Sequence, residues 1–123
     1  MAITINAALR TTRGQAIITD AGTNARLTVY TDGYATVLYT SICAATLGTM
    51  AGAVLTFNAV ADAIATGTGT AAIARLFRTD GTTMVLEGFT VGLSGTDIII
   101  ANPVIATNDT ITTGVSSITE GGA

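Results

Sequence analysis

Turn signals recur along most of this chain at short intervals, and they limit how long any regular element can be. After Gly22, runs rich in β-branched and apolar residues are separated by glycine-rich or Asp-Gly segments. A spacing of roughly 8 to 12 residues between turns is typical of antiparallel sandwiches and barrels. We therefore predict a mainly β fold, an antiparallel β-sandwich or barrel of jelly-roll-like form, with about six to eight strands. The expected strands lie within residues 25–33, 35–42, 53–60, 70–78, 82–91, 96–107 and 109–119.

One short helix is expected at the amino-terminal end. Asn6 can accept hydrogen bonds from the free backbone N–H groups of a helix that begins at Ala7. Gly22 supplies a signal for the end of that helix. The predicted helix spans about residues 6–21. We expect residues 1–123 to form a single β domain, since typical domains hold roughly 100 to 150 residues.

The stretch from Arg78 to Val91 contains the dipeptide Asp80-Gly81 between two β-rich runs. Asp-Gly favours a two-residue hairpin loop, because both central positions of a type I′ turn need a positive φ that aspartate tolerates and glycine prefers. We therefore assign Asp80 and Gly81 to a structural turn between antiparallel strands. A lone aspartate without a second carboxylate, a histidine or a metal-ligand cluster near it in sequence is a weak candidate for acid–base catalysis.

Two segments carry the features of sheet edges. Pro103 cannot donate a hydrogen bond to a neighbouring strand, so residues 96–107 form either an edge strand or two strands broken at Asn102-Pro103. Residues 110–123 are β-rich, terminal and glycine-ended, which favours an edge strand or an arm that a neighbouring chain can pair with. The residues predicted for an interface are Thr110, Ile111, Thr112 and Ile118 in this segment, with Arg75 and Arg78 on the strand before the hairpin turn.

The residue inventory excludes several classes of active site. Histidine, lysine and tryptophan are absent, and Cys43 is the one cysteine. The absence of histidine removes His-based triads, most zinc sites and the commonest general base. No histidine or lysine is present to lower the pKa of Cys43, so we predict a small buried apolar residue there. We expect no enzyme, no catalytic residue, no cofactor and no metal site.

The surface is expected to be poor in charge. Charged residues make up 11% of the chain, against about 25% in an ordinary globular domain. Such a surface suits a protein that is covered by copies of itself or by a partner. The formal net charge of −3 argues against binding to nucleic acid or anionic membranes by bulk electrostatics. No apolar run approaches the roughly 20 residues that span a bilayer. The first residues lack the apolar core of a signal peptide, so we expect a chain made and used in a cytoplasm, or built into a particle there.

Two blocks of the sequence carry a resemblance to a known family. They are "INAALRTTRGQAIITDAG" with "ARLTVYTDG", and "GTAAIARLFRTDGTTMVLEGFTVGLSGTDIIIANPVIATNDTITTGVSSITEG". Together they resemble small structural proteins of tailed bacteriophages, encoded among the head and tail genes. In that family a short helix and an "L-x-V/I-Y-x-G" strand open the chain, and a "GTA…R…D-G" hairpin and an "ITEG" strand close it. The resemblance covers roughly residues 5–30 and 68–121, and residues 34–67 match nothing in it.

The resemblance implies a structural role in a virion, without catalytic residues. Within that class we favour a capsid decoration, or cement, protein on the surface of the phage head, assembled in the host cytoplasm. The implied partners are the major capsid protein and further copies of this chain, with a trimer favoured. Another virion component, of the tail or for head completion, is the first alternative. A ligand-binding β domain, for example for carbohydrate, is an alternative of a different class.

Overall fold

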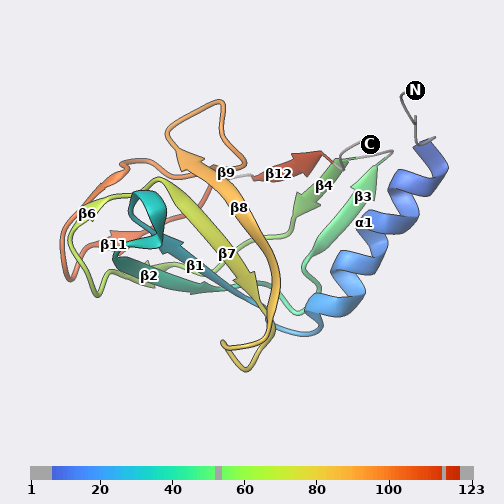
Figure 1. The fold of residues 1–123 in the computed structure, drawn as a ribbon, viewed down its shortest axis with the longest axis horizontal. Helices are drawn as coiled ribbons and strands as arrows, with labels where there is room; N and C mark the ends of the chain where they lie inside the picture. Colours follow the sequence, from blue (N-terminus) through green and yellow to red (C-terminus); the bar gives the residue numbers. More distant parts are fainter. Residues whose placement is uncertain (1–6, 52–53, 115, 120–123) are drawn as a thin grey trace.

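The computed structural model describes residues 7–51, 54–114 and 116–119, and its fold is mainly β with one α-helix, as predicted (Figure 1). The helix lies along one side of the molecule next to two of the strands, and short two-stranded ladders lie at the opposite end. The elements are α1 (Ala7–Ala21), β1 (Arg26–Tyr30), the 3-10 helix η1 (Asp32–Tyr34), β2 (Val37–Ile42), β3 (Gly48–Ala51), β4 (Val54–Phe57), β5 (Ala63–Ile64), β6 (Gly69–Thr70), β7 (Ile73–Phe77), β8 (Met84–Gly92), β9 (Ile98–Ile99), β10 (Val104–Ile105), β11 (Thr110–Ile111) and β12 (Ser117–Thr119).

The helix α1 covers one end of the core. Ile18 and Ala21 are buried, and Gly14 lies so close to the Met50 side chain of β3 that a Cβ there would be 2.3 Å from the Met50 Cε atom. The Gly22 N–H donates to the Ile18 carbonyl oxygen at 3.3 Å, and Gly22 has a φ of 72°. The predicted stop at Gly22 is therefore confirmed, whereas the predicted cap at Asn6 lies outside the described residues.

Two sheets enclose the core. The larger has the order β2-β1-β7-β8-β9, with antiparallel pairing except between β8 and β9, and the smaller has the order β12-β4-β3. Phe57 of β4 and Phe89 of β8 meet edge to face between the two sheets, with ring centroids 6.3 Å apart. Leu27 of β1 and Leu76 of β7 are opposite each other and almost fully buried. The antiparallel pairing in both sheets agrees with the predicted fold class.

Backbone hydrogen bonds extend the larger sheet sideways beyond β2. The Ala61 N–H donates to the Ile42 carbonyl oxygen at 3.0 Å, and the Thr66 N–H donates to the Leu38 carbonyl oxygen at 2.8 Å. These bonds hold β5 beside β2, and β11 pairs with the other edge of β5. The strands therefore lie side by side in the order β11, β5, β2, β1, β7 and β8.

The hairpin at Asp80-Gly81 is confirmed, but the predicted type I′ turn is wrong. β7 and β8 pair antiparallel, and the Arg78 N–H donates to the Thr83 carbonyl oxygen at 2.9 Å, so four residues lie between the closing pair. Gly81 has the expected positive φ, at 73°, whereas Asp80 does not have one. Instead, the Asp80 carboxylate accepts hydrogen bonds from the backbone N–H groups of Thr82 and Thr83, each at 2.8 Å. Side-chain bonding within the loop thus stabilises a longer connection than the dipeptide alone predicts.

The predicted break at Pro103 is confirmed, because residues 96–107 form two strands, β9 and β10, with Pro103 between them. Other strand boundaries differ from the prediction. Residues 109–119 also form two strands, β11 and β12, which pair with β5 and β4. The twelve strands in the described part of the chain exceed the predicted six to eight because several are two-residue ladders. One of the extra strands is β3, in a segment that the sequence analysis leaves outside the strands.

Cys43 occupies the predicted environment. Its side chain is buried, and desolvation by burial raises the pKa of its thiol to about 11. The Cys43 N–H donates to the Ala25 carbonyl oxygen at 2.7 Å. The thiol is therefore protonated at neutral pH and acts as a small apolar core residue.

Gly48 provides a test of how β3 packs on β4. A Cβ atom at Gly48 would lie 2.2 Å from the Thr56 carbonyl oxygen, which is backbone and cannot move aside cheaply. We expect Gly48→Ala to lower the free energy of unfolding by about 1 to 3 kcal/mol, as overpacking does elsewhere. Urea unfolding measures this, with Thr49→Ala at the next, exposed position as the control. Equal stability of Gly48→Ala and the parent would contradict the close approach of the two strands.

Candidate protein–protein interface

The larger sheet buries one face in the core, and its other face is largely exposed, although Thr28 and Tyr30 in the middle of that face are buried. Residues directly opposite each other on paired strands point to the same side, so the register defines three rows of side chains across the exposed face. We call these rows, together with Tyr34, the outer sheet face. The first row is Ile42, Arg26, Phe77 and Met84, the second is Thr40, Thr28, Arg75 and Glu87, and the third is Val37, Tyr30, Ile73 and Thr90.

Large apolar side chains are exposed on this face. Val37, Ile42 and Met84 are 46%, 42% and 49% exposed, and Ile64 on the neighbouring strand β5 is 56% exposed. Scattered exposed apolar residues are ordinary, but several on one continuous face are typical of a surface that a partner covers. The outer sheet face is therefore the candidate for a protein–protein interface.

An arginine held between aromatic rings lies in the middle of the face. The Arg75 guanidinium carbon is 3.7 Å from the centroid of the Tyr34 ring and 5.3 Å from that of Tyr30. The two rings meet edge to face at 5.2 Å. The Arg75 Nε donates to the Glu87 Oε2 at 3.1 Å. Cation–π contacts and the ion pair together fix the guanidinium in one orientation before any partner binds.

Tyr34 is held in a strained backbone conformation. Its φ is 60°, a left-handed value that is unusual for a bulky residue and costs on the order of 1 to 3 kcal/mol. The Tyr34 N–H donates to the Thr31 carbonyl oxygen at 3.1 Å, and the Thr36 N–H donates to the Thr31 Oγ1 at 3.0 Å. These bonds stabilise the tight turn that places the Tyr34 ring over Arg75. Strain of this kind at a half-buried position on the surface motivates a hypothesis of function.

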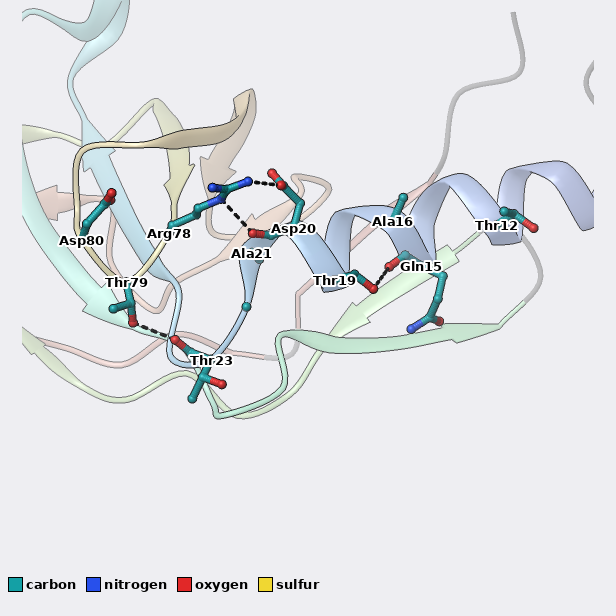
Figure 2. Close-up of a pocket in the computed structure, with 11 residues that line it drawn as sticks. Thr12, Gln15, Ala16, Thr19, Asp20, Ala21, Thr23, Arg78, Thr79 and Asp80 are labelled. Carbon is teal, nitrogen blue, oxygen red and sulfur yellow. Dashed lines mark hydrogen bonds and ion pairs between the residues drawn. The ribbon is translucent and has the colours of Figure 1, made fainter.

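Arg78 has a different environment from Arg75, and Figure 2 shows it beside the C-terminal end of α1. Its Nε donates to the Asp20 carbonyl oxygen at 3.0 Å, and its Nη2 pairs with the Asp20 carboxylate. The Thr79 Oγ1 donates to the Thr23 carbonyl oxygen at 2.6 Å. The hairpin turn is thus tethered to the helix, and the guanidinium of Arg78 is used within the chain. An open groove lies between the helix and the hairpin turn (Figure 2). It is lined by Thr12, Gln15, Ala16, Thr19, Asp20, Ala21, Gly22, Thr23, Arg78, Thr79 and Asp80.

The C-terminal interface candidates do not all lie in one place. Thr110 and Thr112 are exposed, and Thr110 is opposite Ile64 at the margin of the outer sheet face. Ile111 is buried in the core, so its side chain is not on the surface of a single chain. Ile118 is half-buried on β12, opposite Leu55. The structure therefore brings Arg75 and Thr110 to one broad face and places the other candidates elsewhere.

The sequence analysis did not find Tyr30 and Tyr34 as members of the candidate site. The available signal was Asp32-Gly33-Tyr34, a turn sequence placed directly before a β-rich run. Strand alternation alone would also have placed Tyr30 on the same side as Thr28. The two rings and Arg75 are distant in sequence. They come together because β1 pairs with β7, and a reading of local sequence does not reveal that pairing.

The comparisons with known proteins returned nothing. No family model, no curated protein and no solved structure matches this chain. Within residues 7–51, 54–114 and 116–119, no three or more cysteine, aspartate or glutamate side chains lie close enough together to hold a metal ion. No helix of the described chain is long and apolar enough to cross a membrane.

The Asp80 loop predicts a pH dependence of stability. The Thr83 hydroxyl donates to the Asp80 carboxylate at 2.5 Å, and this bond, with those from the Thr83 and Thr82 backbone, lowers the pKa of Asp80 from 3.8 to about 2. Because the folded pKa is depressed, the stabilisation is complete above the unfolded pKa and is lost as the pH falls toward about 2. Asp80→Ala should therefore lower the melting temperature at neutral pH and have a smaller effect near pH 2.

The matched control is Asp32→Ala, which changes the aspartate of the other Asp-Gly pair. No hydrogen bond to the Asp32 carboxylate is present among the described residues, so its removal should shift the melting temperature little at either pH. Thermal unfolding followed by circular dichroism gives both values. An Asp80→Ala effect that is the same at neutral and acidic pH would rule out the charged acceptor as its cause.

Proposed function

We propose that the protein is a non-enzymatic structural component of a tailed-phage virion, a capsid decoration or cement protein that binds and stabilises the assembled head. Its partners are the major capsid protein and further copies of itself, with a trimer favoured. Its place is the outer surface of the capsid, reached after assembly in the host cytoplasm. The resemblance of residues 5–30 and 68–121 to small virion proteins supports the class.

The observation that carries the proposal is the Tyr34–Arg75 cluster on the outer sheet face. Tyrosine and arginine are enriched among the residues that contribute most to protein–protein binding. The Arg75 guanidinium is already fixed by Tyr34 and Glu87, so little side-chain entropy remains to be lost when a partner binds. A broad, preorganised face with exposed apolar residues suits attachment to a large, repetitive surface.

The proposal is tested by removing the Tyr34 ring without disturbing the fold. Tyr34→Gly deletes the ring and also relieves the left-handed strain, since glycine adopts positive φ readily. We expect the variant to be as stable as the parent or more so. Its binding to heads of the phage that encodes the chain should weaken by roughly tenfold or more, as for an interface residue that contributes over about 1.4 kcal/mol. Co-sedimentation with expanded heads measures binding.

Asn108→Gly is the matched control, because Asn108 also has a positive φ, at 77°, and lies outside the outer sheet face. It should bind heads like the parent. A parent chain that never co-sediments with heads would overturn the decoration role and favour a tail or head-completion component, or the ligand-binding alternative. Unchanged binding by Tyr34→Gly would remove the outer sheet face as the site of attachment.

A further inference from the structure

We infer that Asp32-Gly33 is a site of spontaneous covalent modification, at which the aspartate of the folded chain is converted to isoaspartate. The chain has a second Asp-Gly pair, Asp80-Gly81, and its hydrogen bonds protect it from the same reaction. The modification is a change of the backbone that needs no partner, and it lies outside the proposed function. Its effect on the binding of heads rests on that function.

The reaction uses the aspartate side chain, the next backbone nitrogen and water. The Gly33 nitrogen attacks the Cγ atom of the Asp32 carboxyl group in its protonated form. A C–N bond forms, and the carboxyl O–H leaves with the amide proton as water, which gives a five-membered succinimide ring. A solvent water then opens the ring. Opening at Cγ restores aspartate, and opening at the backbone carbonyl carbon gives isoaspartate, whose main chain runs through Cγ. One water is released and one is consumed, so no oxidant or reductant is needed.

The two reacting groups of Asp32-Gly33 are accessible and are not held by other groups. Both residues are exposed and belong to η1. Gly33 has a φ of 69° and a ψ of 17°, which are not helical, so no regular helix fixes this peptide. Within the described residues, neither the Asp32 carboxylate nor the Gly33 N–H makes a hydrogen bond. A Cβ atom at Gly33 would have nothing within 4 Å, so the backbone has room to rotate as the ring closes.

The corresponding groups of Asp80-Gly81 are both held by hydrogen bonds. The Asp80 carboxylate accepts hydrogen bonds from the Thr82 and Thr83 N–H groups at 2.8 Å and from the Thr83 hydroxyl at 2.5 Å. The Gly81 N–H donates to the Arg78 carbonyl oxygen at 2.9 Å. The pKa of Asp80 is lowered to about 2, so its carboxylate is ionised at neutral pH and is a poor electrophile. Ring closure here therefore requires the loss of bonds that the other Asp-Gly pair does not make.

Isoaspartate at position 32 would change the turn that places Tyr34. The hydrogen bond from the Tyr34 N–H to the Thr31 carbonyl oxygen, at 3.1 Å, closes a small ring around Asp32 and Gly33. Isoaspartate adds one main-chain carbon to this ring and so alters its geometry. We therefore expect the Tyr34 ring to leave its position 3.7 Å from the Arg75 guanidinium carbon. Under the proposed function, a chain modified in this way binds heads more weakly.

Peptide mapping of the full chain tests the assignment. All five cations are arginines, so trypsin separates the two Asp-Gly pairs into the peptides 27–75 and 79–123. The folded chain is incubated at physiological temperature and mildly acidic pH, and an endoproteinase that cleaves before aspartate but not before isoaspartate locates the modified residue. We expect isoaspartate to accumulate at least roughly tenfold faster at Asp32 than at Asp80, since the loss of one hydrogen bond to a charged group slows a reaction by about that factor.

Two variants provide matched controls, and melting temperatures verify that both are folded. Asp32→Glu retains the carboxylate but would have to close a six-membered ring, which forms far more slowly, so the modification at this position should be lost. Thr83→Ala removes the hydroxyl donor to Asp80 and should raise the rate at Asp80 several-fold without changing the rate at Asp32. In urea the two Asp-Gly pairs of the parent chain should react at similar rates. Equal rates at the two sites of the folded chain, or a folded chain without isoaspartate at Asp32, would overturn the inference.

The effect on attachment is measured separately, by co-sedimentation of fresh and aged chains with heads. The aged parent chain should lose binding in proportion to its isoaspartate content at Asp32, whereas aged Asp32→Glu should bind as it does when fresh. Full binding by a chain that carries isoaspartate would refute the link between this turn and Tyr34. A parent chain that binds no heads when fresh contradicts the proposed function and leaves the modification site, which the peptide map alone decides.

Discussion

The pairing of β1 with β7 determines most of what this protein presents to its surroundings. It joins a strand near the amino-terminal end to a strand from the middle of the chain. The two strands form five successive residue pairs, from Arg26 opposite Phe77 to Tyr30 opposite Ile73. Every second pair points into the core, where Leu27 meets Leu76. The alternate pairs point outward and bring Arg75 beside Thr28. A slip of one residue in this register would exchange the two faces, so the core and the outer sheet face depend on the same set of backbone hydrogen bonds.

The outer sheet face combines two arginines in different electrostatic settings. Arg75 is fixed between Tyr34 and Glu87, whereas the Arg26 Nε donates to the backbone carbonyl oxygen of Thr79. An arginine that is already paired adds shape and orientation to an interface, and an arginine that lacks a carboxylate can gain one from a partner. The regions around Arg75 and Arg26 thus favour different groups on a bound surface, although both lie on the same sheet.

Local sequence signals predicted the fold class well, because turn spacing and strand alternation act over a few residues. Gly22 ends α1, Pro103 separates β9 from β10, and Cys43 is buried. The failures required tertiary information. Residues 48–51 contain glycine and threonine and do not read as a strand, yet Gly48 is needed there because the Thr56 carbonyl leaves no room for a side chain.

The candidate site was predicted only in part, for a related reason. Alternation along β7 correctly separates Arg75 from its core-facing neighbours, but its ring partners come from β1 and η1, which are distant in sequence. The positive φ of Tyr34 is invisible in the sequence, since nothing in the residue type favours it. The turn at Asp80 shows the same limit, because side-chain bonds to Thr82 and Thr83 select a loop that the dipeptide alone does not specify.

β7 is synthesised well after its partner β1, and this order affects how the chain folds during synthesis. β1 and β2 can form a hairpin as soon as they leave the ribosome, but Leu27 and Val29 then have no strand to complete their side of the sheet. The tether from Arg78 to Asp20 also joins residues 58 apart in the sequence. Non-local pairing of this kind makes folding slow. The nascent amino-terminal half therefore displays an open strand edge at β1 until β7 (Ile73–Phe77) has also left the ribosome, and an open edge of this kind favours pairing with other chains.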